Sequence, residues 1–323
     1  MQRGAAHDTP GTMNPPRPIR LRRGRIAALL ALVLAALAVL VVALGSHGSG
    51  SSGASAARSS TQAHRRHVRT TASRRHDVPL LALPINPSPR TIHVPILTWH
   101  RVAVFAQEYT KSVPDETVEP SVFAAEIDAL ASHGYHPISQ LQLFDALFHG
   151  ASLPSKPVLL TVDDGYVDDV KTILPILHSH HFVATFYIIT RRFHEPGFMD
   201  TTEVRRLDAE GMDIGAHTRN HVPLAAVSAA EMTEQIAGSR RDLERVVGHP
   251  VQWFAYPFGS FDDAVVAAVH KAGFVLAVTT QGGTSESAQA PLTMPRIHIG
   301  RSAGVSTVLT CTSAATACGG GGG

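Results

Sequence analysis

Thr161-Val162-Asp163-Asp164-Gly165-Tyr166 and His217-Thr218-Arg219-Asn220-His221 are the two stretches that decide the fold of this chain. The two Asp of the first stretch follow a short apolar segment, residues 158–162, and His217 follows another, residues 212–216. Both segments are typical of a buried β-strand. Adjacent carboxylates at the end of such a strand are costly, because each raises the pKa of the other unless a cation lies nearby. The two stretches therefore indicate a cation site at the ends of two strands.

The residue types indicate which cation this is. His217 and His221 are four residues apart and can face the same point, and one of the two Asp can join them. Two imidazoles and one carboxylate form a three-ligand site for a divalent metal such as Zn²⁺, with positions left for water and substrate. The remaining Asp can then act as a base on the bound water. This combination is typical of a metallohydrolase.

Around these stretches, strands and helices alternate. We expect strands at residues 94–99, 158–162, 183–189, 212–216, 252–256 and 274–279, and helices at residues 121–133, 139–149, 167–180, 202–210, 228–247 and 262–272. Alternation of this kind predicts a parallel sheet. The reactive residues lie at carboxyl ends of strands, as in (β/α) barrels. The predicted domain covers residues 91–305, and residues 306–323 are predicted to form a flexible tail.

The N-terminal part of the chain has a different composition. Residues 1–25 are basic, and residues 26–44 form an unbroken run of 19 apolar residues, close to the length of about 20 that crosses a bilayer as a helix. Five Arg precede the run closely, which predicts a single-pass anchor with the later residues outside the cell membrane. A cleaved signal peptide and a secreted protein are the alternative. Residues 45–90 are rich in Ser, Gly, Arg and Pro and are predicted to be a disordered linker.

The charge balance excludes one class of partner. Residues 1–90 carry 13 Arg against two Asp, whereas residues 91–323 carry 15 Lys and Arg against 24 Asp and Glu. An acidic domain behind a basic stem argues against nucleic acid, which would require basic surface on the domain itself. We expect a monomer. The two cysteines, Cys311 and Cys318, lie in the predicted tail, and a disulfide between them is an open alternative.

Taken together, these motifs resemble those of the polysaccharide deacetylase family (the NodB-homology domain, carbohydrate esterase family 4). The resemblance covers residues 91–305 and implies a distorted (β/α) barrel. It implies Asp163 as the catalytic base and Asp164, His217 and His221 as the metal ligands, most often of Zn²⁺. Val162 replaces the Phe of the family motif, which is a mild change at a core position.

A third motif departs from the family pattern. The family has Arg-x-Pro-Tyr/Phe, and this chain has Ala255-Tyr256-Pro257-Phe258-Gly259. The Arg that orients the base in many members is replaced by Ala255, as in the subgroup that acts on poly-N-acetylglucosamine, and a divalent cation could keep Asp163 ionised instead. The resemblance implies that the backbone N–H of Phe258 contributes to the oxyanion hole and that Tyr256 lies near the substrate. The alternative is a simple turn.

Three further residues are candidates by resemblance. His298, in Met294-Pro295-Arg296-Ile297-His298-Ile299, corresponds to the general acid of the family, although a surface histidine on a strand has the same pattern. Trp99 and His100 follow the first predicted strand, where the family has residues near the substrate groove. Trp99 can stack on a sugar ring or fill the core.

The resemblance thus predicts a membrane-tethered or secreted hydrolase that removes N-acetyl groups from an envelope or extracellular polysaccharide containing N-acetylglucosamine. Two alternatives stay open at this point. One is a catalytically silent glycan-binding module, against which the complete set of Asp163, Asp164, His217 and His221 argues. The other is a metal-dependent hydrolase of a different C–N bond.

Overall fold

The computed structural model describes residues 78–106 and 113–313. The predicted membrane anchor and most of the predicted linker lie outside these residues. Within the described ranges, no helix is both long enough and apolar enough to cross a membrane.

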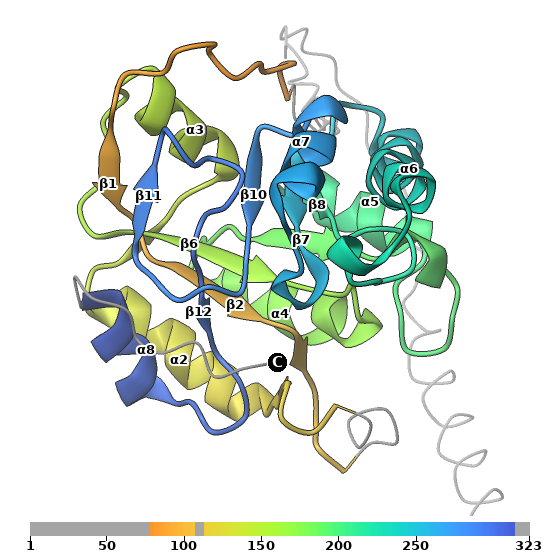
Figure 1. Cartoon of the computed structure of the whole chain (residues 1–323). Coiled ribbons are helices and arrows are strands. Elements are labelled where there is room, and N and C mark those ends of the chain that lie inside the picture. The colour runs from red at the N-terminus through yellow and green to blue at the C-terminus, as the bar shows by residue number, and fades with distance from the viewer. Residues whose placement is uncertain (1–77, 107–112, 314–323) are drawn as a thin grey trace, which may run out of the picture. The chain divides into compact units, whose positions relative to one another are not determined.

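The centre of the fold is a curled parallel sheet (Figure 1). Its strands are, in spatial order, β10 (Leu276–Val278), β9 (Trp253–Ala255), β8 (Asp213–Ala216), β7 (Thr185–Ile188), β6 (Pro157–Val162), β2 (Ile96–Trp99) and β12 (Ile297–His298), and β5 (His136–Pro137) also pairs with β6. All of these pairings are parallel. An isolated bridge joins Val278 of β10 to Met294, which lies just before β12. The predicted α/β class is confirmed, and the sheet forms a half-barrel.

The carboxyl ends of parallel strands meet at one edge of a sheet, so this topology gathers residues that are far apart in the sequence. In the register, Trp99 lies opposite Val162, and Thr98 lies opposite His298. The residues after β2, β6 and β8 and those at the end of β12 are therefore brought together. β12, the last strand of this sheet in the sequence, lies beside β2, the first.

Helices pack around the sheet. They are α2 (Pro120–Ser132), α3 (Gln140–Phe148), α4 (Val167–Ser179), α5 (Thr201–Ala209), α6 (Ala229–Val247), α7 (Asp263–Lys271) and α8 (Val305–Ser313). Local sequence sets several of their ends. Ser139 forms a capping box with Gln142 at the start of α3, and Ser228 caps α6, which ends at Gly248 in the left-handed conformation.

Two small pairings lie outside the main sheet. Strands β1 (Thr91–His93) and β11 (Ser285–Ser287) are antiparallel, and β3 (Arg101–Val102) and β4 (Thr117–Val118) are parallel. The sequence patterns did not indicate these short strands, because two or three residues are too few to show a periodicity. The β3–β4 pairing matters for function, because it brings Glu116 close to the end of β2.

Both ends of the predicted domain need correction. Residues 306–323 were predicted to form a flexible tail, but residues 305–313 form α8, which lies beside α2 (Figure 1). Val308 and Cys311 of this helix are buried, which explains why it is ordered. Cys311 is disulfide-bonded, and Cys318, the only other cysteine of the sequence, lies outside the described residues.

The predicted linker also ends earlier than residue 90. The backbone N–H of Leu81 donates a hydrogen bond to Gln252, and the Arg90 guanidinium donates one to the carbonyl of Ala146. Leu83 packs against the core. The residues from Leu81 onward are therefore part of the domain surface.

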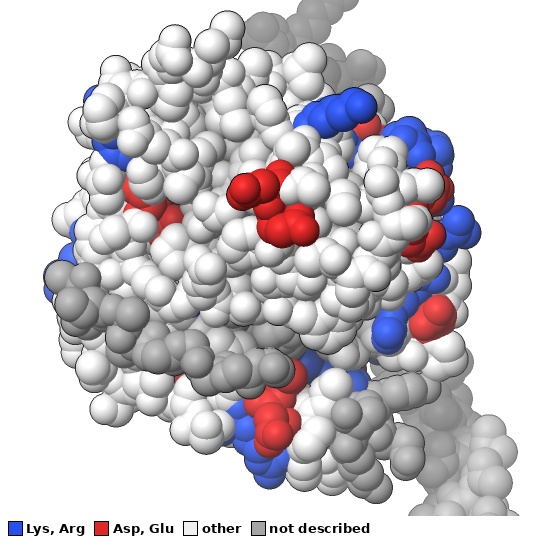
Figure 2. Space-filling view, viewed as in Figure 1, with Lys and Arg blue, Asp and Glu red and all other residues white. Residues whose placement is uncertain are grey.

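The surface of the described domain carries both signs of charge. On the face shown in Figure 2, acidic and basic side chains lie in small separate groups among uncharged residues. That distribution leaves most of this face without a strong local field.

Candidate active site

Four of the seven non-glycine residues with positive φ among the described residues lie at one place. Asp164, Thr218, His221 and Phe258 all adopt positive φ values, of 76°, 62°, 56° and 58°. Each value lies in the left-handed region that non-glycine residues rarely adopt, and such strain is retained where the surrounding structure fixes it. These residues come from the loops after β6, β8 and β9, whose ends the sheet brings together.

Asp164, His217 and His221 form a three-residue cluster suited to a metal ion. The Nε2 atoms of His217 and His221 each lie 3.6 Å from Oδ1 of Asp164. This separation is too long for a hydrogen bond, but ligands held at about 2.1 Å around a tetrahedral ion lie about 3.4 Å from each other. Among the described residues, Oδ1 of Asp164 is buried without a hydrogen-bond partner. The cluster therefore fits a divalent metal.

Hydrogen bonding and burial prepare the two histidines as ligands. Nδ1 of His217 lies 2.9 Å from the carbonyl oxygen of Ala255 and donates to it, which leaves Nε2 free to bind a metal. Burial lowers the pKa of His217 and of His221 to about 4, so both rings are neutral near pH 7. Burial raises the pKa of Asp164, and a bound cation would offset the cost of that buried charge.

Asp163 is held by an arginine that the sequence analysis did not identify. The guanidinium of Arg296 donates to both carboxylate oxygens of Asp163, at 2.8 and 2.6 Å, and both side chains are buried. Burial alone would raise the pKa of Asp163, but Arg296 holds that pKa well below its usual range. We expected a base without an orienting arginine because Ala255 replaces the family Arg. Arg296, just before β12, supplies that contact instead.

The threonines around Arg296 fix its orientation. Its guanidinium also donates to the hydroxyl oxygens of Thr98 and Thr161, at 3.0 and 3.2 Å, and to the carbonyl of Thr279 at 2.9 Å. A buried arginine with several partners keeps one geometry. The sequence did contain a sign of this residue, because Arg296 lies two positions before His298 in the stretch Met294 to Ile299, whose pattern suits a strand. A charge facing inward from a buried strand needs a buried partner.

The two aromatic residues of the third motif differ in exposure. Phe258 is 60% exposed, and its ring centroid lies 4.5 Å from that of His221. Tyr256 is buried, and its hydroxyl donates to the carbonyl of Leu292, so this hydroxyl is not available to a substrate. Its ring still lines the cavity described below.

Trp99 belongs to the core. It is 1% exposed, its indole N–H donates to Glu126 at 3.0 Å, and its ring meets Phe123 edge-on. The alternative that Trp99 stacks on a sugar is therefore wrong for this structure. The side chain of Trp99 faces α2, whereas the next residue, His100, lines the cavity.

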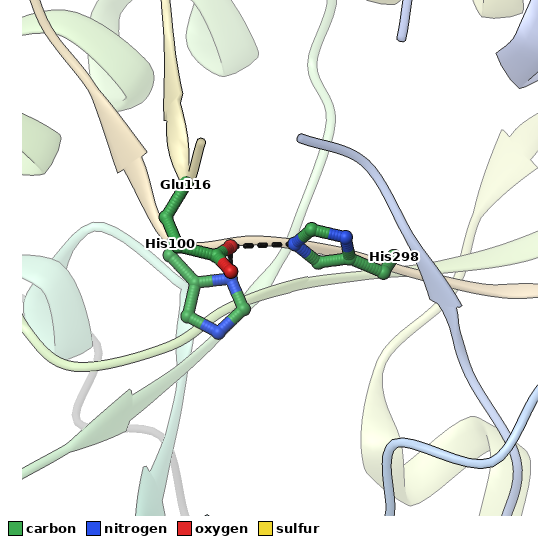
Figure 3. Close-up of side chains that lie close together, drawn as sticks. All are labelled: His100, Glu116 and His298. Atoms are coloured by element: carbon green, nitrogen blue, oxygen red, sulfur yellow. Dashed lines mark hydrogen bonds and ion pairs between the residues drawn. The ribbon is translucent and has the colours of Figure 1, made fainter. Parts of the chain in front are cut away.

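The two candidate histidines meet at a glutamate that has no motif. Oε2 of Glu116 lies 3.1 Å from Nδ1 of His100 and 2.5 Å from Nε2 of His298 (Figure 3). The other ring nitrogen of His100 lies 4.0 Å from Oδ2 of Asp163. No ion pair between His298 and Asp163 is found in the described part of the chain. His100 is thus nearer to the base than the predicted acid His298.

Most of the candidate residues, but not Trp99, line one cavity of about 250 Å³. Its lining includes His100, Glu116, Asp163, Asp164, His217, His221, Tyr256, Phe258, Arg296 and His298. A second cavity of about 380 Å³ shares Asp164, His221 and Phe258 with it. A larger cavity of about 840 Å³, near Phe148 and Pro291, contains none of these residues, so we place the chemistry in the two adjoining cavities.

Comparisons with known proteins agree with this geometry. The family model described as polysaccharide deacetylase matches residues 150–277. The Bacillus subtilis protein YxkH is 23% identical over 206 residues, which are 64% of this chain and 71% of that protein. A peptidoglycan-N-acetylglucosamine deacetylase of Bacillus cereus is 28% identical over 154 residues, 47% of this chain and 54% of that protein.

Two further matches extend the comparison. A poly-beta-1,6-N-acetyl-D-glucosamine N-deacetylase of Escherichia coli is 31% identical over 90 residues, 28% of this chain and 13% of that protein. Among solved structures, the Streptococcus pyogenes deacetylase PplD in complex with acetate has a TM-score of 0.65 and 25% identity, and the match covers 70% of this chain and all of that chain.

Proposed function

Because the chain belongs to the polysaccharide deacetylase family of hydrolases, we propose that it is a metal-dependent enzyme that removes N-acetyl groups from a polysaccharide containing N-acetylglucosamine. The observation that carries this proposal is that two neighbouring carboxylates have different partners. Asp163 is bound to Arg296, and Asp164 faces two neutral histidines at the spacing of metal ligands. A site that only binds glycan has no need of this arrangement.

We propose Zn²⁺ as the metal, held by Asp164, His217 and His221, since two imidazoles and one carboxylate are typical zinc ligands. When bound, such an ion lowers the pKa of a water molecule and polarises the carbonyl of the acetamide. The residues of the chain supply the other parts of the reaction.

Asp163 is suited to the role of base. Arg296 keeps its carboxylate ionised and fixes its direction, and both carboxylate oxygens are already held when substrate arrives. Asp163 takes a proton from the water that attacks the acetamide carbon. The backbone N–H of Phe258 is our candidate donor to the carbonyl oxygen as that oxygen gains negative charge.

The leaving nitrogen must gain a proton before the C–N bond breaks. We assign this proton to His100 in place of His298, because Nε2 of His100 lies 4.0 Å from Asp163, whereas Nε2 of His298 faces Glu116. A donor close to the base suits a reaction in which both act on one amide group. The products are acetate and a free amino sugar.

The surroundings of the site suit a polymer. The adjoining cavity of about 380 Å³ offers room beside the acetyl site. Phe258 is 60% exposed and lines both cavities, so its ring is available at their junction. Aromatic faces of this kind pack against the apolar faces of sugar rings. The B. cereus and E. coli relatives act, by their names, on N-acetylglucosamine polymers, which supports the same substrate class here.

The full-length chain tests the proposal directly. Acetate release is measured with peptidoglycan, poly-N-acetylglucosamine, chitin oligomers and acetylated xylan, before and after removal of metal with a chelator and after addition of Zn²⁺. We expect release from at least one N-acetylglucosamine polymer, loss with chelator and recovery with Zn²⁺. Binding of a glycan without any release, by protein that contains metal, would favour the silent module.

We further propose that residues 26–44 tether the domain to the cell membrane with residues 45–323 outside. The support is the run of 19 apolar residues preceded by five Arg. Fractionation of cells that produce the full chain should place the domain in the membrane fraction, accessible to protease from outside. Mature protein free in the medium and starting near residue 57 would show a cleaved signal peptide instead.

A further inference from the structure

His100, Glu116 and His298 form a second cluster with the composition of a metal site (Figure 3). Two imidazoles and one carboxylate bind many divalent metals. His100 follows β2, Glu116 precedes β4, and His298 ends β12. The three side chains are each about a quarter exposed and line the same cavity as the Asp164 cluster. Composition alone would therefore assign two metals to this cavity.

The distances within the two clusters differ, and the difference has a physical meaning. In the Asp164 cluster both histidine nitrogens lie 3.6 Å from the carboxylate oxygen. In the second cluster one oxygen, Oε2 of Glu116, lies 2.5 Å from His298 and 3.1 Å from His100. Ligand atoms at about 2.1 Å from a common ion lie about 3.4 Å apart around a tetrahedral ion and about 3.0 Å apart around an octahedral one. The 2.5 Å contact with His298 is too short for either and is a hydrogen bond to the carboxylate, whereas the 3.1 Å contact with His100 is an ion pair without hydrogen-bond geometry.

We propose that Glu116 is a positioning residue that joins His100 and His298 into one proton-carrying unit, and that this unit binds no second metal. Glu116 accepts a hydrogen bond from Nε2 of His298 and lies in ion-pair distance of Nδ1 of His100, whose Nε2 lies on the side of Asp163. This inference rests on the proposed deacetylation. It assigns a role to Glu116, for which no sequence motif exists.

The electrostatics of Glu116 agree with this arrangement. Burial would raise its pKa, but the hydrogen bond from His298 and the nearby His100 hold that pKa below its usual value. A carboxylate that stays ionised stabilises positive charge on the imidazoles next to it. The hydrogen bond from His298 holds Oε2 of Glu116 in place and so limits the rotation of the carboxylate.

Two protons move in the proposed reaction, one from water to Asp163 and one to the amide nitrogen. In this scheme the protonated ring of His100 has its Nδ1–H beside Glu116 and its Nε2–H directed at the amide nitrogen. As the C–N bond breaks, its electron pair passes to nitrogen, and the proton moves from Nε2 of His100 to that nitrogen. Asp163 holds the proton taken from the attacking water. The attacking oxygen keeps its other hydrogen, so acetic acid leaves with the amine and ionises to acetate in water. Asp163 then releases its proton, and neutral His100 takes one up.

Two substrates whose leaving groups differ in basicity can distinguish a role of Glu116 in proton transfer from a role in folding. An amide nitrogen must gain a proton as it leaves, because the N–H of a neutral amine is an extremely weak acid. A phenolate leaves without a proton, because phenols are far stronger acids. We therefore compare deacetylation of N-acetylglucosamine oligomers with hydrolysis of 4-nitrophenyl acetate by the full-length protein. The variants are Glu116→Gln and His298→Gln, and the control is Glu195→Gln, an exposed glutamate outside the cavity.

For Glu116→Gln we expect kcat on the amide to fall roughly tenfold to a hundredfold, within the range of general acid catalysis. Ester hydrolysis should change less than about threefold. His298→Gln should show the same pattern with a smaller amide loss, because His298 acts only through Glu116. Equal losses on both substrates would mean that Glu116 merely supports the fold, and unchanged amide turnover would also overturn the proposal.

Metal content provides a readout that does not depend on activity. After incubation with Zn²⁺ and removal of excess, the full-length wild type should contain one metal per chain, and Glu116→Gln should contain one as well. Two metals in the wild type, with one lost in Glu116→Gln, would identify the second cluster as a metal site. If the wild type deacetylates no glycan, the proposed function fails, and the metal count still decides the nature of this cluster.

Discussion

Arg296 donates two hydrogen bonds to Asp163, at 2.6 and 2.8 Å, although the two residues are 133 positions apart. Both side chains are about 2% exposed. The pair explains how a chain with Ala at position 255 keeps an oriented, ionised carboxylate beside a candidate metal site. Burial would otherwise favour the protonated form of Asp163, which cannot accept a proton from water.

Arg296→Met should reduce both activity and stability. It leaves the buried carboxylate of Asp163 without its partner, which typically costs about 3–5 kcal/mol. We expect deacetylation to fall by about a hundredfold or more, because the base loses its charge and its direction. Urea unfolding and acetate release measure the two effects. In the double variant with Asp163→Asn the loss of stability should be smaller, and an additive loss would argue against coupling of the pair.

The two neighbouring aspartates should respond differently to mutation. Asp164→Ala, His217→Ala and His221→Ala should each lose bound metal and activity together, because they remove a ligand. Asp163→Asn should retain metal and lose turnover by about a hundredfold. Metal analysis and acetate release on the same preparations check both outcomes. Metal loss in Asp163→Asn with retention in Asp164→Asn would reverse our assignment.

Ala255→Arg should not raise activity and should lower stability. Ala255 is fully buried, its carbonyl accepts the hydrogen bond of His217, and Asp163 already has both oxygens bound to Arg296. A second buried cation would lack a partner, which costs several kcal/mol. Thermal unfolding and acetate release measure this. Restored or increased turnover by about tenfold, equal to about 1.4 kcal/mol of barrier, would show that Arg296 does not replace the family arginine.

Trp99→Phe should destabilise the fold without changing substrate affinity. The indole N–H is the donor to buried Glu126, whose pKa burial raises to about 7 despite that hydrogen bond. Loss of the donor leaves a buried carboxyl oxygen unpaired, at a cost of about 1–3 kcal/mol. Phe258→Ala is the matched contrast, since this exposed ring should affect KM and not stability. A raised KM with unchanged stability in Trp99→Phe would return Trp99 to the substrate groove.

The ion pair of His249 with Asp208 should make stability depend on pH. Burial would lower the pKa of His249, but the hydrogen bond to Asp208, at 2.7 Å, raises it above its usual value of 6.5. The folded state thus binds the proton more tightly than the unfolded state. The resulting stabilisation is complete below pH 6.5 and is lost as pH rises through the higher folded-state pKa.

Urea unfolding at pH 5.5 and at pH 8.5 measures this dependence. The free energy of unfolding should fall more over this interval in the wild type than in Asp208→Asn, which lacks the carboxylate. The difference between the two proteins isolates the pair from other groups that titrate. An equal pH dependence in both would show that His249 gains nothing from Asp208.

The sequence by itself predicted the candidate metal ligands and their place at the ends of strands. Asp163 and Asp164 follow β6, and His217 follows β8, within a residue of where the apolar pattern ends. The positions of these residues could be predicted because they depend on local information: a strand is a short apolar run, and its end is marked by polar residues. Helix starts at Ser139 and Ser228 were likewise set by side chains close in sequence.

The tertiary structure alone decided which residues assist those ligands. Arg296 reaches Asp163 and Glu116 reaches His298 across 133 and 182 positions, and both contacts exist because β12 pairs with β2 at the far end of the chain. Strand order in a sheet depends on the packing of all its elements, and no local pattern records it. The same holds for Trp99, because alternation along β2 shows that neighbouring side chains face opposite sides, whereas only the packed helices show which side is the core.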